Sequence, residues 1–304
     1  MPEKNRVYRA RIEGYTSEGL GVARIDGQAV FVHRALRGED CDVLILKVLK
    51  NAAFGKAVRV YEPSPHRVEP DCPYYGRCGG CDFRHMDRTE ELAAKRQRVQ
   101  DALRRIGGSA VTVEGIDGGA PLHYRNKSQY PVAADGSVGF YKARSHQVVP
   151  VTQCLIQKPQ ADAAAQALRT YIASCGVSCY DEKTRQGLVR HLYIRTNGAG
   201  QSLICVVVNG KKLPGEEELV RLLRQAAPET VGVVLGVNTQ PTGAVLGTEY
   251  RTLWGADVLT DTLCGLTFRL SVPSFYQVNR EMAERLYARA VEFAGLTGTE
   301  TVLD

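Results

Sequence analysis

Hydrophobic and polar residues alternate along the first sixty positions, in short runs separated by glycine. Alternation with a period of two is typical of strands that bury one face, and glycine favours the turns between them. The pattern predicts a small β-barrel of the OB type over residues 1–62. The expected strands are Val7–Ile12, Gly21–Ile25, Gln28–Val32, Asp42–Lys50 and Phe54–Val60.

A helical pattern begins after a proline-containing linker near Glu62 and a cysteine-rich loop. Residues Asp87–Ile106 are rich in Glu, Leu, Ala, Lys, Arg and Gln, and two glycines follow them. This composition and ending predict one helix with a single apolar stripe. The stripe comprises Leu92, Val99, Leu103 and Ile106.

The pattern then becomes mixed, which predicts a central α+β region. Helices are expected over Lys158–Ser174 and Glu216–Gln225, the second just after Pro214. The expected strands are Val111–Ile116, Lys127–Val132, Val138–Tyr141, Leu188–Thr196, Leu203–Val208, Val231–Val237 and Leu266–Leu270.

The last thirty residues change character. Ser274–Asn279 leads into a helix that reaches about Ala294, and Glu300–Asp304 resembles a buried parallel strand. A helix followed by such a strand is typical of the start of a doubly wound α/β sheet. We expect a buried helical stripe of Met282, Leu286, Ala290 and Phe293.

These patterns predict a multi-domain chain. We expect a β-barrel over 1–62, a cysteine loop over 63–92, a central α+β domain over 93–272, and the first helix and strand of an incomplete α/β domain over 273–304. With 304 residues and 44% hydrophobic content, the chain can form more than one core. No stretch is long and apolar enough to span a bilayer, and no secretory signal starts the chain. Nine cysteines without such a signal indicate a reducing, cytoplasmic location.

Four cysteines carry the strongest chemical signal. Cys72, Cys78 and Cys81 are spaced C-x5-C-x2-C, and Cys154 follows far downstream. Three thiolates from one loop and a fourth from elsewhere suit a 4Fe–4S cluster, whereas structural zinc usually takes two short pairs. Zinc and plain buried thiols remain alternatives. Cys175 and Cys179 form a C-x3-C pair, for which packing is the simpler interpretation.

Basic and aromatic residues are interleaved between positions 121 and 151. Arg125 and Lys127 lie beside tyrosines, and Phe140 precedes Lys142. Rings that stack on bases and cations that meet phosphates suit single-stranded RNA. The formal charge of +6 agrees with a polyanionic partner. Simple strand alternation is the competing interpretation.

Several motifs together resemble the RNA uracil-5-methyltransferase family, in particular its 23S ribosomal RNA branch. The first module resembles a TRAM domain, and the four cysteines match the family's cluster ligands. Four further segments carry the likeness, namely His123–Lys127, Gly139–Tyr141, Gly187–Arg195 and Phe275–Asn279.

The resemblance implies S-adenosylmethionine as methyl donor, with Gln277 as a cofactor contact. It implies a covalent mechanism in which a cysteine adds to uracil C6. In the family, a glycine-rich loop, the nucleophilic Cys and a catalytic Glu follow the strand that ends in Val-Leu-Asp. The sequence stops at Asp304, so we expect no catalytic residue in this chain and no methylation by it alone. We expect a monomer that binds 23S rRNA and no membrane.

Three other hypotheses remain open. The RNA target could be transfer RNA. The chain could be a stand-alone RNA-binding iron–sulfur protein without catalysis. A radical methylthiotransferase can also carry a TRAM domain, but it needs C-x3-C-x2-C spacing and an iron without a protein ligand.

Overall fold

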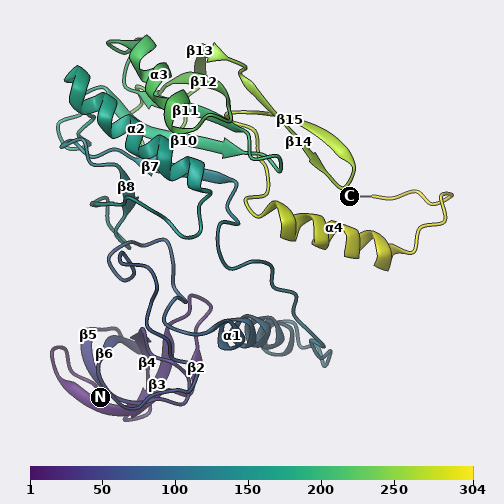
Figure 1. Ribbon diagram of the computed structural model, residues 1–304. Coiled ribbons are helices and arrows are strands. Elements are labelled where there is room, and N and C mark those ends of the chain that lie inside the picture. Colours follow the sequence, from purple (N-terminus) through teal and green to yellow (C-terminus); the bar gives the residue numbers. More distant parts are fainter. Residues whose placement is uncertain (304) are drawn as a thin grey trace. The chain divides into compact units, whose positions relative to one another are not determined.

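The structure is a computed structural model that describes residues 1–303, and it divides into two compact units. Unit 1 comprises Met1–Tyr75 and Gly80–Gly118, and unit 2 comprises Gly76–Gly79 and Gly119–Asp304. The chain therefore crosses from one unit to the other within the cysteine loop. Figure 1 draws both units and labels most of their elements. The four-part division expected from the sequence stays a prediction.

Unit 1 contains a six-stranded sheet in the order β1-β5-β6-β4-β3-β2, all antiparallel except the β4–β6 pair. The backbone N–H of Ile12 donates to Glu39 O at 2.8 Å, and that of Glu13 donates to Val22 O at 2.7 Å. The residues between β1 and β2, the two edge strands, thus hydrogen-bond to both edges of the sheet, as expected for a barrel. The strands are β1 Val7–Arg11, β2 Gly14–Tyr15, β3 Gly21–Ile25, β4 Gln28–His33, β5 Asp40–Val48 and β6 Ala52–Glu62.

The expected helix of unit 1 is α1, Arg88–Asp101, continued by a π-helical turn η1, Ala102–Ile106. Asp87 caps it by accepting from the Glu90 N–H at 2.9 Å. The buried carboxylate of Glu90 connects the helix to the barrel because Tyr15 Oη donates to it at 2.8 Å and Arg37 at 3.1 Å.

Two expectations for this region are wrong. A single apolar stripe was expected to give the helix its packing face, but Val99 and Ile106 on it are 50% and 88% exposed, because the described residues of unit 1 do not cover that part of the stripe. Residues 111–116 form no strand. The side chain of Gln100 instead donates to Val111 O and accepts from Val113 N–H, so backbone groups that a strand would pair are bonded to α1.

Unit 2 is built on a five-stranded sheet in the order β13-β12-β11-β10-β7. Strands β11 and β12 are parallel, with α3 as the crossover between them, and the other pairs are antiparallel. Short hairpins β8–β9 and β14–β15 complete the unit. The strands are β7 Lys127–Pro131, β8 Gly139–Tyr141, β9 Val148–Pro150, β10 Val189–Thr196, β11 Ser202–Val208, β12 Thr230–Val237, β13 Glu249–Gly255, β14 Val258–Leu263 and β15 Leu266–Ser271.

Strands β10 and β11 are buried along their whole length because both faces of the sheet are covered. Leu203, Cys205 and Val207 pack against the β14–β15 hairpin. Helices α2 Pro159–Cys175 and α3 Glu216–Ala226 also pack on this sheet (Figure 1). The continuous apolar run that predicted a buried strand is thereby explained.

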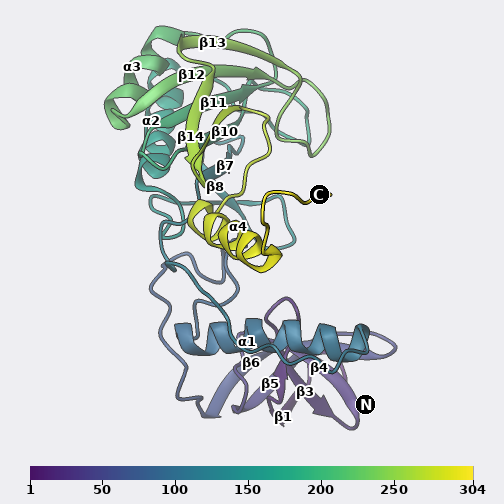
Figure 2. The same cartoon turned by 90° about the vertical axis from the view of Figure 1, so that its right-hand side faces the viewer.

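The last helix, α4 Arg280–Ala294, is confirmed, and it lies apart from α2 and α3 (Figure 2). Its expected buried stripe is wrong, since Leu286 is 63% and Phe293 79% exposed and the described residues of unit 2 leave that face uncovered.

The expected strand at 300–304 is also not formed over residues 300–303, and Asp304 lies outside the described residues. The Glu300 carboxylate accepts from the N–H groups of Thr297 and Gly298, and these local bonds favour a compact turn. In residues 1–303 no helix is both long enough and apolar enough to span a bilayer.

Candidate functional site

Two segments that are far apart in the sequence meet in unit 2 at Asn126. Its backbone N–H donates to Val278 O and its side-chain amide donates to Gln277 O, both at 2.9 Å. Arg125 forms a β-bridge with Asn279 beside them. The basic segment His123–Lys127 is therefore joined to the backbone of Gln277, the predicted cofactor residue, and of Val278 by hydrogen bonds from Asn126.

The other side of the basic segment contacts the turn that follows Cys154. Arg125 N–H donates to Ile156 O at 3.0 Å, and His123 Nδ1 lies 2.6 Å from Gln157 O. His123 has a φ of 51°, a strained conformation for a residue with a side chain. The segment thus lies between the Cys154 turn and the Gln277–Asn279 segment.

Positive charge is concentrated at this junction. Burial lowers the pKa of Lys127, and the nearby charges of Arg195 and Arg125 lower it further. Neither Arg125 nor Lys127 pairs with a carboxylate among residues 1–303. Arg195 is buried and donates to the carbonyls of Val272 and Ser274. The junction therefore has unbalanced positive charge, which favours an anionic ligand.

The segment before α4 is anchored, yet it presents side chains outward. The buried Tyr276 hydroxyl donates to Asp261 at 2.9 Å, and Asn279 caps α4 by accepting from Met282 N–H. Gln277 is exposed and Phe275 is 82% exposed. A fixed backbone with an exposed amide and an exposed ring suits contact with a ligand.

Two of the four predicted cluster cysteines, Cys78 and Cys154, belong to unit 2. Cys78 and Lys142 form an antiparallel β-bridge through their backbones, and Gly79 N–H donates to Tyr141 O at 2.9 Å. A Cβ on Gly79 would lie 2.8 Å from the backbone of Ala143, so this approach requires glycine. Lys142 itself is exposed.

Cys154 is held by the first turn of α2. Its N–H donates to the buried Asp162 carboxylate at 2.8 Å, and Tyr130 Oη donates to the same carboxylate at 2.8 Å. Burial raises the pKa of the Cys154 thiol, and Cys78 is near enough to contribute. The ring of Phe140 packs on buried Tyr130, with centroids 4.7 Å apart, so this predicted RNA contact also has a packing role.

The other two predicted ligands, Cys72 and Cys81, belong to unit 1 and are partly exposed. Within residues 1–303, no three His, Cys, Asp or Glu side chains are grouped to hold a metal ion. All nine cysteines are free thiols. Four thiols with this spacing fit the chemistry of an iron–sulfur cluster, and the cluster stays a prediction.

The sequence did not single out Asn126, Asp162 or Arg195. Each is a buried polar residue whose partners lie on another segment. Asn126 lies inside the recognised His123–Lys127 segment and Arg195 ends the recognised Gly187–Arg195 segment, and these were the available signals. For the C-x3-C pair, burial raises the pKa of Cys179 to about 11, which agrees with a packing role.

Comparison with known proteins supports the assignment of the first module. A TRAM domain model matches residues 3–58, which confirms the TRAM prediction. An uncharacterized RNA methyltransferase of Clostridium tetani is 41% identical over 99% of this chain and 67% of its own length. One of Halalkalibacterium halodurans is 38% identical with the same coverage. The chain belongs to this RNA methyltransferase family.

The solved structures show a matching fold. The crystal structure of Pyrococcus abyssi tRNA (uracil-54, C5)-methyltransferase in complex with S-adenosyl-L-homocysteine aligns with a TM-score of 0.73. It is 20% identical and the alignment covers 93% of this chain and 64% of that one. The chain thus spans about two thirds of the length of the relatives that it matches.

Proposed function

We propose that the protein takes part in S-adenosylmethionine-dependent methylation of uridine C5 in 23S ribosomal RNA. The observation that carries this proposal is the junction at Asn126, which hydrogen-bonds the segment containing Arg125 and Lys127 to the backbone of Gln277. In this proposal Gln277 contacts the cofactor, while Arg125 and Lys127 bind RNA phosphates. Phe140 and Lys142 are proposed RNA contacts on the β8–β9 hairpin.

The proposed reaction is covalent. A cysteine thiolate adds to uracil C6, and C5 then takes the methyl group from the sulfonium, which leaves as S-adenosylhomocysteine. A base removes the C5 proton, and loss of the thiolate restores the ring. The target base must leave its stack to react. Asn126 would hold Gln277 and the basic segment at a constant separation during these steps.

We propose that the nucleophile is not among the cysteines of residues 1–304. Burial raises the pKa of Cys41 and Cys179 to about 11 and that of Cys205 to about 12, so their thiolates are rare near pH 7.

We also propose that Cys72, Cys78, Cys81 and Cys154 ligate a 4Fe–4S cluster. The support is four free thiols in the expected spacing, together with the Asp162 contact that holds the backbone of Cys154. Such a cluster, when bound, would cross-link distant parts of the chain. Zinc is the alternative that metal analysis would separate.

Deletion of the gene tests the proposed reaction and its target. Loss of 5-methyluridine from 23S rRNA, with transfer RNA unchanged, is the expected result by mass spectrometry of digested RNA. Loss from transfer RNA alone would favour the second candidate, for which the fold match to a tRNA enzyme is the specific support. Unchanged 5-methyluridine in both RNAs would contradict methylation and favour a binding role.

A further inference from the structure

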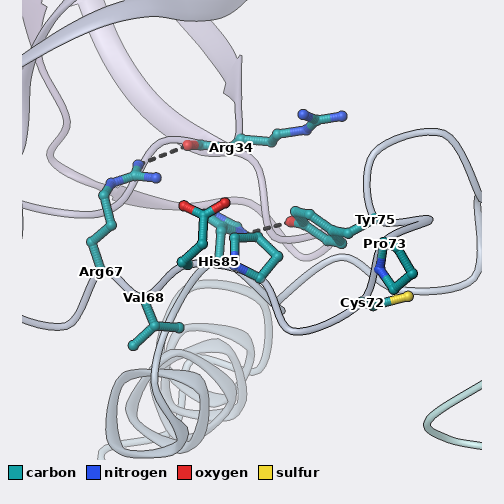
Figure 3. Close-up of a pocket in the computed structure, with 9 residues that line it drawn as sticks. Arg34, Arg67, Val68, Cys72, Pro73, Tyr75 and His85 are labelled. Carbon is teal, nitrogen blue, oxygen red and sulfur yellow. Dashed lines mark hydrogen bonds between the residues drawn. The ribbon is translucent and has the colours of Figure 1, made fainter.

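Unit 1 contains a cavity of about 470 Å³ that none of the proposed RNA and cofactor contacts uses, and the proposed cluster ligand Cys72 is one of its lining residues (Figure 3). Its walls come from the end of β4, from the linker after β6 and from the cysteine loop, and they include Arg34, Val68, Pro73, Tyr75 and His85. This volume is typical of sites for small ligands.

His85 supplies a hydrogen-bond acceptor in this cavity. Tyr75 Oη donates to the Asp82 carbonyl at 2.8 Å, so its oxygen accepts from His85 Nδ1 at 2.6 Å. Nδ1 therefore carries the proton, and Nε2 has a free lone pair. His85 is only 2% exposed, and Nε2 has no partner within the described residues. A ligand that donates a hydrogen bond would satisfy this atom.

Arg34 supplies an unpaired cation at the same cavity. Its φ of 60° is uncommon for a residue with a long side chain, and Arg67 supports this backbone by donating to Arg34 O at 2.9 Å. Its guanidinium lies 5.4 Å from the centroid of the Tyr75 ring. Figure 3 draws both side chains. Arg34 forms no ion pair with a carboxylate of residues 1–303. Guanidinium groups bind phosphates well.

On the basis of the proposed function, we propose that this cavity holds one nucleotide of the RNA substrate other than the target uridine. Arg34 binds its phosphate. Val68 and Pro73 contact the sugar and base, and the ribose 2′-hydroxyl donates to His85 Nε2. A contact to the 2′-hydroxyl distinguishes RNA from DNA.

The test uses the 304-residue chain with fluorescein-labelled single-stranded RNA of about 12 nucleotides, and DNA of the same sequence. Arg34→Asn removes the charge and tolerates the left-handed backbone. We expect it to weaken RNA binding about tenfold and to lower the slope of log K against log salt by about 0.7. Lys50→Asn is the matched control, since it removes one exposed charge from the same unit, and we expect little change.

A second measurement needs no variant. We expect the 15N resonance of His85 Nε2 to shift on addition of RNA and not of DNA. The inference fails if that resonance does not move, if DNA moves it equally, or if Arg34→Asn and Lys50→Asn have equal effects. If Lys127→Ala weakens RNA binding and Arg34→Asn does not, only the cavity assignment is lost. If the unmodified chain binds no RNA, the proposed function fails with it.

Discussion

The side-chain amide of Asn126 donates a 2.9 Å hydrogen bond to the carbonyl of Gln277, 151 residues further along the chain. Asn126 is 6% exposed, and its backbone N–H donates a hydrogen bond to the carbonyl of Val278, the residue that follows Gln277. One buried residue thus joins the segment proposed to bind RNA to the segment proposed to bind the cofactor.

Asn126→Ala is expected to lower the unfolding free energy of unit 2 by about 1–3 kcal/mol, because the Gln277 carbonyl loses its donor. Trp254, the one tryptophan of the chain, lies on β13 and can report unfolding of this unit by fluorescence in urea. We expect S-adenosylmethionine binding to weaken as well. Gln129→Ala, at an exposed position on β7, should change neither quantity. Equal stability of the two variants would contradict the role of Asn126.

Lys127→Ala is expected to weaken RNA binding and to lower the salt slope by about one unit, as for loss of one phosphate contact. Fluorescence anisotropy over a series of salt concentrations measures both. Lys183→Ala removes an exposed charge elsewhere in unit 2 and should leave the slope unchanged. An unchanged slope for Lys127→Ala would remove this residue from the interface.

Anaerobic purification is expected to yield about four iron and four sulfide per chain, the composition of a cubane cluster. Cys154→Ser should lose most of this iron, while Cys264→Ser, at an exposed turn between β14 and β15, should retain it. Metal analysis and the visible absorption spectrum give the result. Stoichiometric zinc in place of iron would disprove the cluster.

Stability of unit 2 is expected to fall as the pH is lowered from about 7 towards 4. Burial lowers the pKa of His191 to about 4, and the charge of Arg190 contributes. The unfolded chain, with an ordinary His pKa of about 6.5, therefore binds the proton first, so the stabilisation is complete above that pH and is lost below it. At pH 4 the free energy of unfolding is therefore expected to be lower by about 3 kcal/mol than at pH 7 because of His191.

His191→Gln should remove this part of the pH dependence. Urea unfolding of both proteins at pH 7 and pH 4.5, followed by Trp254 fluorescence, provides the comparison. The same decrease in stability for the variant and the unmodified chain would show that other groups are responsible.

Sequence patterns predicted most of the helices and strands because periodicity reports which side of an element is buried. Strand β14 was missed for a physical reason. Its inward positions are Leu259, Asp261 and Leu263, and a carboxylate interrupts the apolar alternation. Asp261 is tolerated there because Tyr276 and the Gly198 N–H donate to it.

Periodicity did not predict burial correctly where burial depends on whether another element packs on the apolar face. Val99 on α1 and Leu286 on α4 lie on apolar stripes, yet both are exposed. The candidate site shows the same limit. The motifs identified Arg125, Lys127 and Gln277, but the contact through Asn126 depends on how the chain folds over 151 residues. A single sequence does not contain that pairing in any local pattern.

The assignment of Gly76–Gly79 to unit 2 has a consequence for dissecting the protein. A recombinant fragment that starts at Gly119 would omit these four residues. The Tyr141 carbonyl would then lack the Gly79 N–H that bonds to it, and Lys142 would lack its bridge to Cys78. Expression of the second half as a contiguous piece would remove part of its own structure, so fragments should be produced together with residues 76–79.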